Sequence, residues 1–197
     1  MQPKPSIHSR RPNQSDPRVQ RTRARILAVA RELLPEVGLT GMTYALLAER
    51  AGVTRQTLYR HWSNRAALLS DITLQDPDLS NPEPGTDVRA VLTAWLVRMR
   101  TALTVPATRT ARLAMATEAD HDPDSAQAMA RILEDRLAAL NKLLEPTGLQ
   151  ITAEQYTLLY GPLLARLLFE RTEVTDEFID TVVTLWLTTI DHTPTRS

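Results

Sequence analysis

Hydrophobic residues recur at helical spacing along most of the chain. Between residues 18 and 37, Ile26, Ala30, Leu33 and Leu34 follow the 3.6-residue period of an amphipathic helix. The chain has only six Gly and few alternating β-branched runs, which argues against strands. The pattern therefore predicts an all-α fold. Further helices are expected near residues 43–51, 54–62, from 64 onwards, 87–104, 107–118, 125–145, from 152 over about twenty residues, and 175–190.

Caps and prolines mark several of the predicted boundaries. Pro35 lies inside the first helix, where its missing N–H and its ring predict a kink or an early end. Residues 76–87 contain four Pro or Gly, which predicts a loop and a domain boundary. Gly161 and Pro162 predict a kink in the helix that starts near residue 152. The expected caps are Ser63, Thr86 or Asp87, and the capping-box pairs Asp124 with Gln127 and Thr152 with Gln155.

Residues 43–69 predict two short helices joined by a tight turn at Gly52, with a third helix directly after them. Leu47 on the first helix, and Leu58 and Trp62 on the second, are the inward-facing apolar positions. The outward residues of the second helix are Arg55, Gln56, Thr57, Tyr59, Arg60 and His61. Arg and Gln can bond base edges in the major groove, and Tyr and His can donate to phosphate. An ordinary helical hairpin with a solvated polar face is the alternative.

The stretch from about Arg21 to Leu69 resembles the DNA-binding domain of the TetR (tetracycline-repressor-like) family. The run AGVTRQTLYRHW, with Arg65 three places further on, is specific to that family among helix-turn-helix proteins. The positions that match are Ile26, Ala30, Leu33, Gly38, Thr43, Leu47, Ala48, Ala51, Gly52, Val53, Thr57, Leu58, Tyr59, His61, Leu68 and Leu69.

The resemblance implies a three-helix domain that binds double-stranded DNA, followed by a larger helical domain. It places Arg55, Gln56 and Thr57 at base-reading positions. Contacts to the DNA backbone are expected from Thr43, Tyr44, Thr54, Tyr59, His61 and Arg65. Tyr44 departs from the small or aliphatic residue that is usual at its position, and inward packing is the alternative for its ring.

Charge is unevenly distributed, although the net charge is zero. Residues 1–75 hold 12 Lys and Arg against 5 Asp and Glu, whereas residues 76–197 hold 11 against 18. The two parts therefore carry +7 and −7, and only the first is suited to a polyanion.

Composition and charge together predict three parts. Residues 1–17 are expected to form a disordered arm, 18–75 the DNA-binding domain, and 76–197 a domain for ligand sensing and dimerisation. Three basic residues of the arm either contact phosphates or have no role. They are Lys4, Arg10 and Arg11.

The TetR resemblance implies that the larger domain binds a small molecule and forms a dimer. The last two predicted helices carry apolar residues around much of their circumference, which two copies would bury as a four-helix bundle. The core of the monomer is the alternative use of these residues. The predicted dimer interface is Leu163, Leu167, Phe178, Val182, Leu185 and Trp186. The predicted ligand pocket, with core packing as the alternative role, is Trp95, Met99, Leu103, Met115, Met129, Tyr156 and Tyr160.

Other chemistry has little support. The chain has no Cys, which excludes disulfides and thiolate sites and fits a cytoplasmic protein. Asp120, His121, Asp122 and Asp124 form the one cluster of potential metal ligands, and a solvated acidic loop is the better interpretation. No apolar run reaches the length of a membrane span. We therefore expect no metal, no cofactor, no membrane contact and no enzymatic activity.

The functional prediction is a ligand-released transcriptional repressor that binds a near-palindromic operator as a homodimer. The effector is an unidentified small molecule. The alternative is a helical protein-interaction module that binds no operator. Salt separates the two, because the affinity of a DNA binder falls with a log–log slope of about −0.9 per phosphate contacted.

Overall fold

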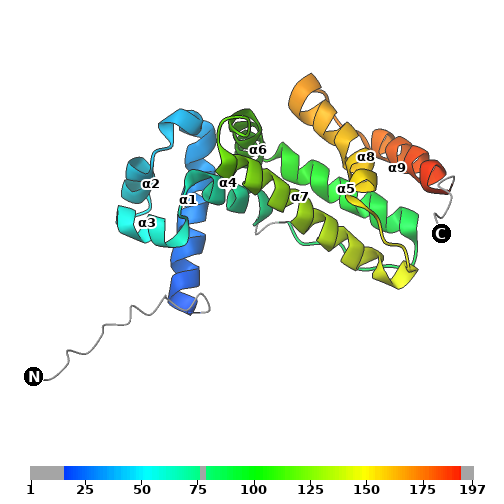
Figure 1. Cartoon of the computed structure of the whole chain (residues 1–197), viewed down its shortest axis with the longest axis horizontal. Helices are drawn as coiled ribbons and strands as arrows, with labels where there is room; N and C mark the ends of the chain where they lie inside the picture. Colours follow the sequence, from blue (N-terminus) through cyan, green and yellow to red (C-terminus); the bar gives the residue numbers. More distant parts are fainter. Residues whose placement is uncertain (1–15, 76–78, 192–197) are drawn as a thin grey trace, which may run out of the picture.

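The computed structural model describes residues 16–75 and 79–191, and all regular structure in these ranges is helical. The predicted all-α fold is confirmed. The helices are α1 (Pro17–Gly41), α2 (Tyr44–Arg50), α3 (Arg55–His61), α4 (Arg65–Leu74), α5 (Val88–Thr104), α6 (Pro106–Glu118), α7 (Pro123–Leu144), α8 (Ala153–Leu164) and α9 (Asp176–Asp191), with a 3-10 helix η1 (Glu145–Thr147) and a π-helical segment η2 (Ala165–Glu170). Figure 1 shows α1–α4 at one end of the molecule and α8 and α9 toward the other, with α6 and α7 between them.

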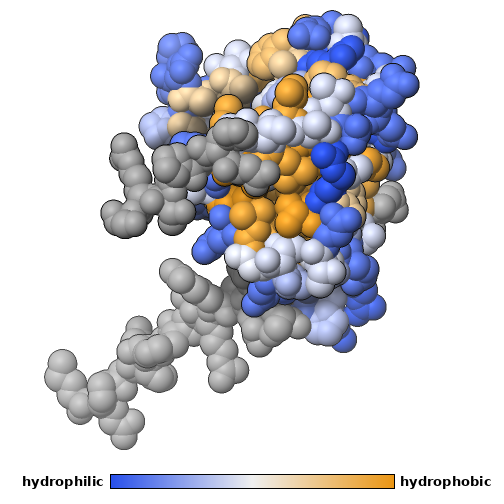
Figure 2. Space-filling view, turned by 90° about the vertical axis from the view of Figure 1, so that its right-hand side faces the viewer, coloured by the Kyte–Doolittle hydropathy of each residue, from blue (hydrophilic) through white to orange (hydrophobic). Residues whose placement is uncertain are grey.

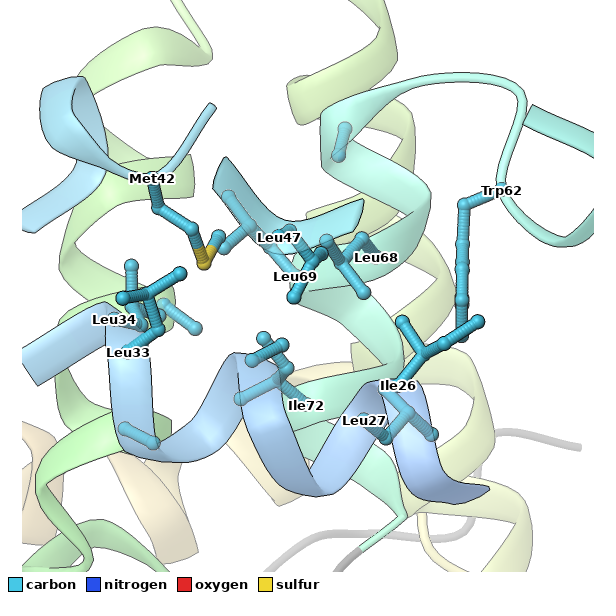
Figure 3. Close-up of a cluster of buried hydrophobic side chains, with 14 of the residues drawn as sticks. Ile26, Leu27, Leu33, Leu34, Met42, Leu47, Trp62, Leu68, Leu69 and Ile72 are labelled. Carbon is cyan, nitrogen blue, oxygen red and sulfur yellow. The ribbon is translucent and has the colours of Figure 1, made fainter. Parts of the chain in front are cut away.

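The first hydrophobic core joins α1–α4 to α6 and α7. Ile26, Leu47 and Ile72 are fully buried in it, and Figure 3 shows the side chains of α1 facing those of α2 and α4. Met115 of α6 and Ile132 of α7 belong to the same cluster. Each such buried side chain stabilises the fold by about 1.5–3 kcal/mol. Helices α1 and α4, which support α2 and α3, therefore bury apolar surface partly against helices α6 and α7 of the larger half.

A second core holds α5, α7, α8 and α9 together. Trp95 of α5, Tyr156 of α8 and Trp186 of α9 are buried in it. The indole nitrogen of Trp186 donates to the Gln155 carbonyl oxygen at 2.7 Å, which fixes α9 against the first turn of α8. Helix α7 has residues in both cores, so it connects the two halves of the molecule.

Helix α1 ends differently from the prediction. The helix continues through Pro35, and the break comes at Gly38, whose φ of 67° and ψ of −179° are not helical. Gly38 reaches this left-handed φ at little cost because it has no Cβ. The predicted kink or early end at Pro35 is therefore wrong by three residues.

Two of the predicted caps are wrong. Asn64 and not Ser63 caps α4, because its Oδ1 accepts from the Ala67 N–H at 2.8 Å. Asp122 and not Asp124 caps α7, and its carboxylate accepts from the backbone N–H groups of Asp124 and Ser125.

Three other helix starts are as predicted. The capping box of Thr152 with Gln155 is present at α8, and Asp87 caps α5 through the Ala90 N–H. At α9, Thr175 accepts from the Phe178 N–H at 3.2 Å. Helix α8 continues through Gly161 and Pro162, where a kink was predicted, to Leu164, and the π-helical η2 follows from Ala165.

The predicted N-terminal arm lies almost entirely outside the described residues, which also applies to Lys4, Arg10 and Arg11. Helix α1 begins at Pro17, directly after the cap Asp16, whose Oδ1 accepts from the Arg18 N–H at 2.8 Å.

Candidate nucleic-acid interface and internal cavity

A helix-turn-helix is built from α2, the turn at Gly52 and α3. Thr43 caps α2 by accepting from the Leu46 N–H at 3.2 Å, and Gly52 takes a left-handed φ of 62° that turns the chain. The Val53 N–H then donates to the Ala48 carbonyl at 3.0 Å, which ties the turn to α2. Thr54 caps α3 by accepting from the Thr57 N–H at 3.1 Å.

The two faces of α3 differ in burial. Leu58 is fully buried and Trp62, directly after the helix, is 2% exposed. Arg55 and Gln56, in the first turn, are exposed. Thr57 is half-buried, and its hydroxyl lies 3.0 Å from that of Thr54. The first turn of α3 therefore presents one guanidinium and one amide to solvent on a helix whose other face is fixed in the core.

Asp71 of α4 fixes the end of α3. Its carboxylate accepts from the Trp62 indole at 2.6 Å, from the Gln75 amide at 2.9 Å, and from the guanidinium of Arg23. The Arg23 guanidinium also lies over the Trp62 ring, 5.2 Å from its centroid. Because α1, α3 and α4 meet at this one carboxylate, the orientation of α3 is coupled to both of the longer helices.

Tyr44 and Tyr59 lie side by side but differ in their environment. The Tyr44 hydroxyl donates to the Asn64 carbonyl at 2.7 Å, whereas Tyr59 is 58% exposed and its ring centroid lies 4.9 Å from that of Tyr44. Burial, and then the neighbouring Tyr59, raise the pKa of Tyr44 to about 12. The one hydroxyl proton of Tyr44 is thus used within the protein, which favours the inward-packing alternative over the predicted phosphate contact.

His61 is half-buried, and its Nε2 is inaccessible and has no hydrogen-bond partner among the described residues. Burial lowers the pKa of His61 below 6.5, and the positive charges of Arg60 and Arg23 lower it further. The predicted phosphate contact of His61 is therefore restricted to the N–H of its other ring nitrogen, from a neutral imidazole.

Arg65 begins α4 and connects three elements. Its Nη1 donates to the Leu39 carbonyl at the end of α1 at 3.1 Å, and its Nη2 lies 3.9 Å from the Glu118 carboxylate at the end of α6. The side chain remains 44% exposed beside the same surface as Tyr59. The predicted phosphate contact at Arg65 is thus compatible with its position, next to an acidic partner from the other half of the molecule.

Comparison with known proteins agrees with this geometry. Residues 26–72 match the model of the bacterial regulatory proteins of the tetR family, and residues 82–186 match that of the tetracyclin repressor-like C-terminal domain. The chain belongs to the TetR family. TetR-family proteins are transcriptional regulators with a DNA-binding helix-turn-helix, so α2 and α3 form the DNA-binding motif of this TetR-family chain.

Two relatives show how far the TetR-family likeness extends. An uncharacterised HTH-type transcriptional regulator of Bacillus subtilis, YdeS, is 30% identical over 177 residues, which cover 85% of this chain and 88% of YdeS. The class C tetracycline repressor of Escherichia coli is 47% identical over only 47 residues. Among solved structures, the TetR family regulator SCO0332 is 28% identical with a TM-score of 0.68, covering 85% of this chain and 97% of that one.

The larger half of the TetR-family chain contains a cavity of about 280 Å³ between α6, α7 and α8. Three of the predicted pocket residues, Met129, Tyr156 and Tyr160, line it. Four do not, because they are buried among other core side chains: Trp95, Met99, Leu103 and Met115. For these four, burial supports the alternative role, which is core packing.

Two arginines of the cavity wall were missed by the sequence analysis. Arg112 of α6 and Arg136 of α7 line the cavity and are only 8% and 6% exposed. The signal for Arg136 was present, because it occupies one position in an apolar series at four-residue spacing along α7. The other members of the series are Ala128, Ile132, Leu140 and Leu144.

Three of the six residues predicted for the dimer interface are buried within the monomer. Leu163, Val182 and Trp186 are buried in the core of the monomer and are not accessible to a second copy. Leu185 is 63% exposed, and Leu167 and Phe178 are half-buried.

Two large apolar side chains on α8 and η2 are exposed, although they are not among the six residues predicted for the interface. Leu158 is 61% exposed and Phe169 is 75% exposed. With half-buried Pro162 and Ala165 between them, they follow the helical period along one side of this segment. Figure 2, which views the molecule from the side where α9 ends, shows apolar side chains gathered in the middle of that face.

Within residues 16–75 and 79–191, no group of three His, Asp or Glu side chains is placed to hold a metal ion. In the same part of the chain, no helix is long and apolar enough to cross a membrane.

Proposed function

We propose that the protein is a homodimeric repressor that binds a near-palindromic operator and is released by a small-molecule effector. The observation that carries the proposal is the two-sided character of α3. Leu58 and Trp62 anchor it in the core, while Arg55 and Gln56 project from its first turn. Helix-turn-helix proteins place that turn against base edges in the major groove, where Arg and Gln can each form two hydrogen bonds to one base.

The proposed DNA contacts fall into base contacts and phosphate contacts. Arg55 and Gln56 read bases, and the methyl group of Thr57 contacts a neighbouring edge. The phosphate contacts are assigned to Thr43, Thr54, Tyr59 and Arg65, with the His61 N–H as a neutral donor. Tyr44 is proposed to position α2 against the start of α4, because its hydroxyl donates to the Asn64 carbonyl.

A dimer is supported by the apolar side chains left exposed on α8, η2 and α9. Leu158, Phe169 and Leu185 are each more than 60% exposed, although large apolar residues seldom gather on the surface of a monomer. A two-fold axis through this face would bury them and hold two copies of α3 in successive major grooves. In this proposal, residues 18–75 bind DNA and residues 76–197 provide dimerisation and effector binding.

Effector control is supported by the packing of the two halves. The cavity is bordered by α6 and α7, which share the first core with α1 and α4. A ligand that changes the position of α6 or α7 would therefore change the position of α4 and, through Asp71, that of α3. Coupling of about 1–3 kcal/mol, which is typical of allostery, weakens DNA binding by about 5- to 150-fold.

The DNA-binding part of the proposal is tested by replacing one base-reading residue. Arg55→Ala should cost about 1–3 kcal/mol on the preferred duplex and relax the sequence preference at one step. Arg60→Ala, at the far end of α3, is the matched control and should weaken all duplexes alike. Binding of labelled duplexes measured by fluorescence anisotropy distinguishes the two effects. If Arg55→Ala changes neither affinity nor preference, α3 does not read the bases.

A further inference from the structure

The cavity wall carries two positive charges that no described carboxylate neutralises. Arg112 and Arg136 are the two charged side chains among the buried residues of the described chain, and both line the cavity. Neither forms an ion pair with any described Asp or Glu. Burying a cation without an anion is costly, because the lost hydration is not replaced by an opposite charge. The described part of the protein therefore supplies no negative charge to balance these two cations.

The contacts of the two arginines show which donors remain available. Arg136 donates from Nη2 to the Thr73 carbonyl at 3.1 Å and from Nη1 to the Met99 sulfur at 2.8 Å, and its buried Nε has no partner. Arg112 makes no hydrogen bond with any described residue. Both acceptors of Arg136 are neutral, so neither of them compensates its charge.

The Tyr156 hydroxyl is a further donor of the cavity wall. It is buried, its proton has no acceptor among the described residues, and the neighbouring Trp95 indole can only donate to it. Burial and then the neighbouring Tyr160 raise the pKa of Tyr156, whereas the charges of Arg136 and Arg112 lower it. The net effect is a raised pKa, so the hydroxyl keeps its proton and can donate it. Thr157 is not free, because its hydroxyl donates to the Ala153 carbonyl at 2.9 Å.

The rest of the wall is apolar. Met129, Ile132 and Leu133 of α7 and Leu164 of α8 provide it. The volume of about 280 Å³ lies at or below the roughly 300–1,000 Å³ that is usual for ligand pockets, so the occupant is small. Apolar walls with donors concentrated at two arginines suit a molecule with one anionic end and an apolar body.

We propose that this cavity binds a small amphipathic carboxylate, which Arg112 and Arg136 neutralise while Tyr156 donates to it and the apolar walls enclose its body. A guanidinium matches the planar carboxylate with two parallel N–H groups. This proposal rests on the proposed effector-controlled function and names the chemical class of the effector.

The same arginine offers a route from the ligand to DNA. Arg136 of α7 also holds the Thr73 carbonyl in the last turn of α4. A carboxylate that draws the Arg136 guanidinium toward the cavity competes with that carbonyl, and thereby loosens α7 from α4. Helix α4 carries Asp71, which fixes the end of α3.

The test compares acids with their uncharged amides. Phenylacetate with phenylacetamide, hexanoate with hexanamide, and inorganic phosphate are titrated into the full-length protein by calorimetry. Each acid should bind at least about ten times more tightly than its amide, because one hydrogen bond to a charged group raises affinity by about that factor or more. The preference should disappear in Arg112→Met and in Arg112→Gln, and remain in Arg131→Met, which changes an exposed arginine of α7.

The ligand-free variants provide a second readout. Arg112→Met removes an uncompensated buried charge and should raise the melting temperature by about 2–4 °C, whereas Arg131→Met should leave it unchanged. A melting temperature lowered by Arg112→Met would show that the arginine stabilises the empty fold and would overturn the proposal. So would acids that bind no better than their amides, phosphate that binds as tightly as the acids, or an acid preference that survives both Arg112 variants.

Failure of the effector function is distinguishable from failure of the carboxylate site. An acid that binds with the expected preference but leaves an operator complex intact supports the site and contradicts ligand release. An operator complex that is released by an uncharged compound, with no acid preference in the titrations, supports ligand release and contradicts the carboxylate site.

Discussion

At the end of α3, His61 is held in its neutral form by its surroundings. Its Nε2 is buried and has no hydrogen-bond partner among the described residues, so protonation would place an unpaired N–H at this atom. The nearby positive charges of Arg60 and Arg23 add to this effect. The stability of the C-terminal end of α3 should therefore depend on pH through His61, which the sequence suggested only as a phosphate contact.

Stability should accordingly fall in mild acid. The pKa of His61 is lowered in the folded state, so below a pH of about 6.5 the unfolded chain binds more protons than the folded one and folding loses stability as the pH falls. Urea unfolding at pH 7.5 and pH 5.5 should show a larger loss for the wild type than for His61→Gln, which does not titrate. Equal losses for the two proteins would contradict the burial of His61 in solution.

The sequence was informative about side chains whose position depends on local spacing. Leu58 and Trp62 lie four residues apart on a short helix, so their shared inward face was predictable, as was the exposure of Arg55 and Gln56. The environment of Tyr44 was left open between two roles, because its hydroxyl acceptor, the Asn64 carbonyl, lies twenty residues away in the chain. Arg136 lies in an apolar series at four-residue spacing along α7, so its burial was predictable, whereas the burial of Arg112 depends on helices distant in sequence.

At the scale of elements, the helix-turn-helix is fixed to its neighbours by a few hydrogen bonds. Tyr44 of α2 bonds the carbonyl that precedes α4, and Asp71 of α4 bonds Trp62 after α3. These contacts set the angle between the short helices, which have too few residues to be stable alone. Geometry at the DNA surface is therefore maintained by side chains that do not face the DNA.

Tyr44 and Tyr59 form a matched pair for testing this arrangement. Tyr44→Phe removes a hydrogen bond within the protein and should lower the free energy of unfolding by about 1 kcal/mol. Tyr59→Phe removes an exposed hydroxyl, so it should leave stability unchanged and weaken binding to all duplexes alike. Urea unfolding and anisotropy titrations measure the two quantities. Full stability with reduced DNA affinity in Tyr44→Phe would mean that its hydroxyl faces phosphate after all.

Element boundaries were predicted where a local signal decides them and not elsewhere. The capping box of Thr152 with Gln155 is a local pattern and is present. The end of α1 depends on competition between two residues, and Gly38 provides the break because only there does the backbone turn to a positive φ. At α7, the local pattern of Asp124 with Gln127 predicted the wrong cap, because the helix begins one residue earlier, at Pro123, and Asp122 accepts from its first N–H groups.

At the scale of the whole molecule, the first core continues from α1–α4 into α6 and α7, so the DNA-binding helices are packed against the larger half. The larger half also leaves apolar side chains exposed on α8, η2 and α9, which a second copy could cover. The periodicity of the last two helices predicted an excess of apolar residues, but it could not assign each one to the monomer core or the surface. Val182 and Trp186 proved to be core residues, whereas Leu158 and Phe169 are exposed.

Charges on the exposed face should separate the dimer. The double variant Leu158→Glu with Phe169→Glu would bury two carboxylates from each copy and should give a particle of one chain, 22.1 kDa, in sedimentation equilibrium. Ala126→Glu, at an exposed position near the start of α7 and outside the cavity wall, is the control and should sediment at twice that mass. A double variant that remains dimeric would place the interface elsewhere.

Joint reading of DNA by two copies of α3 can be measured by selecting bound duplexes from a random pool with the purified protein. The enriched duplexes should carry two inverted half-sites whose centres lie about 10 base pairs, or a multiple of that, apart. Retained duplexes without inverted symmetry, or a pool that is not enriched at low salt, would contradict this joint reading.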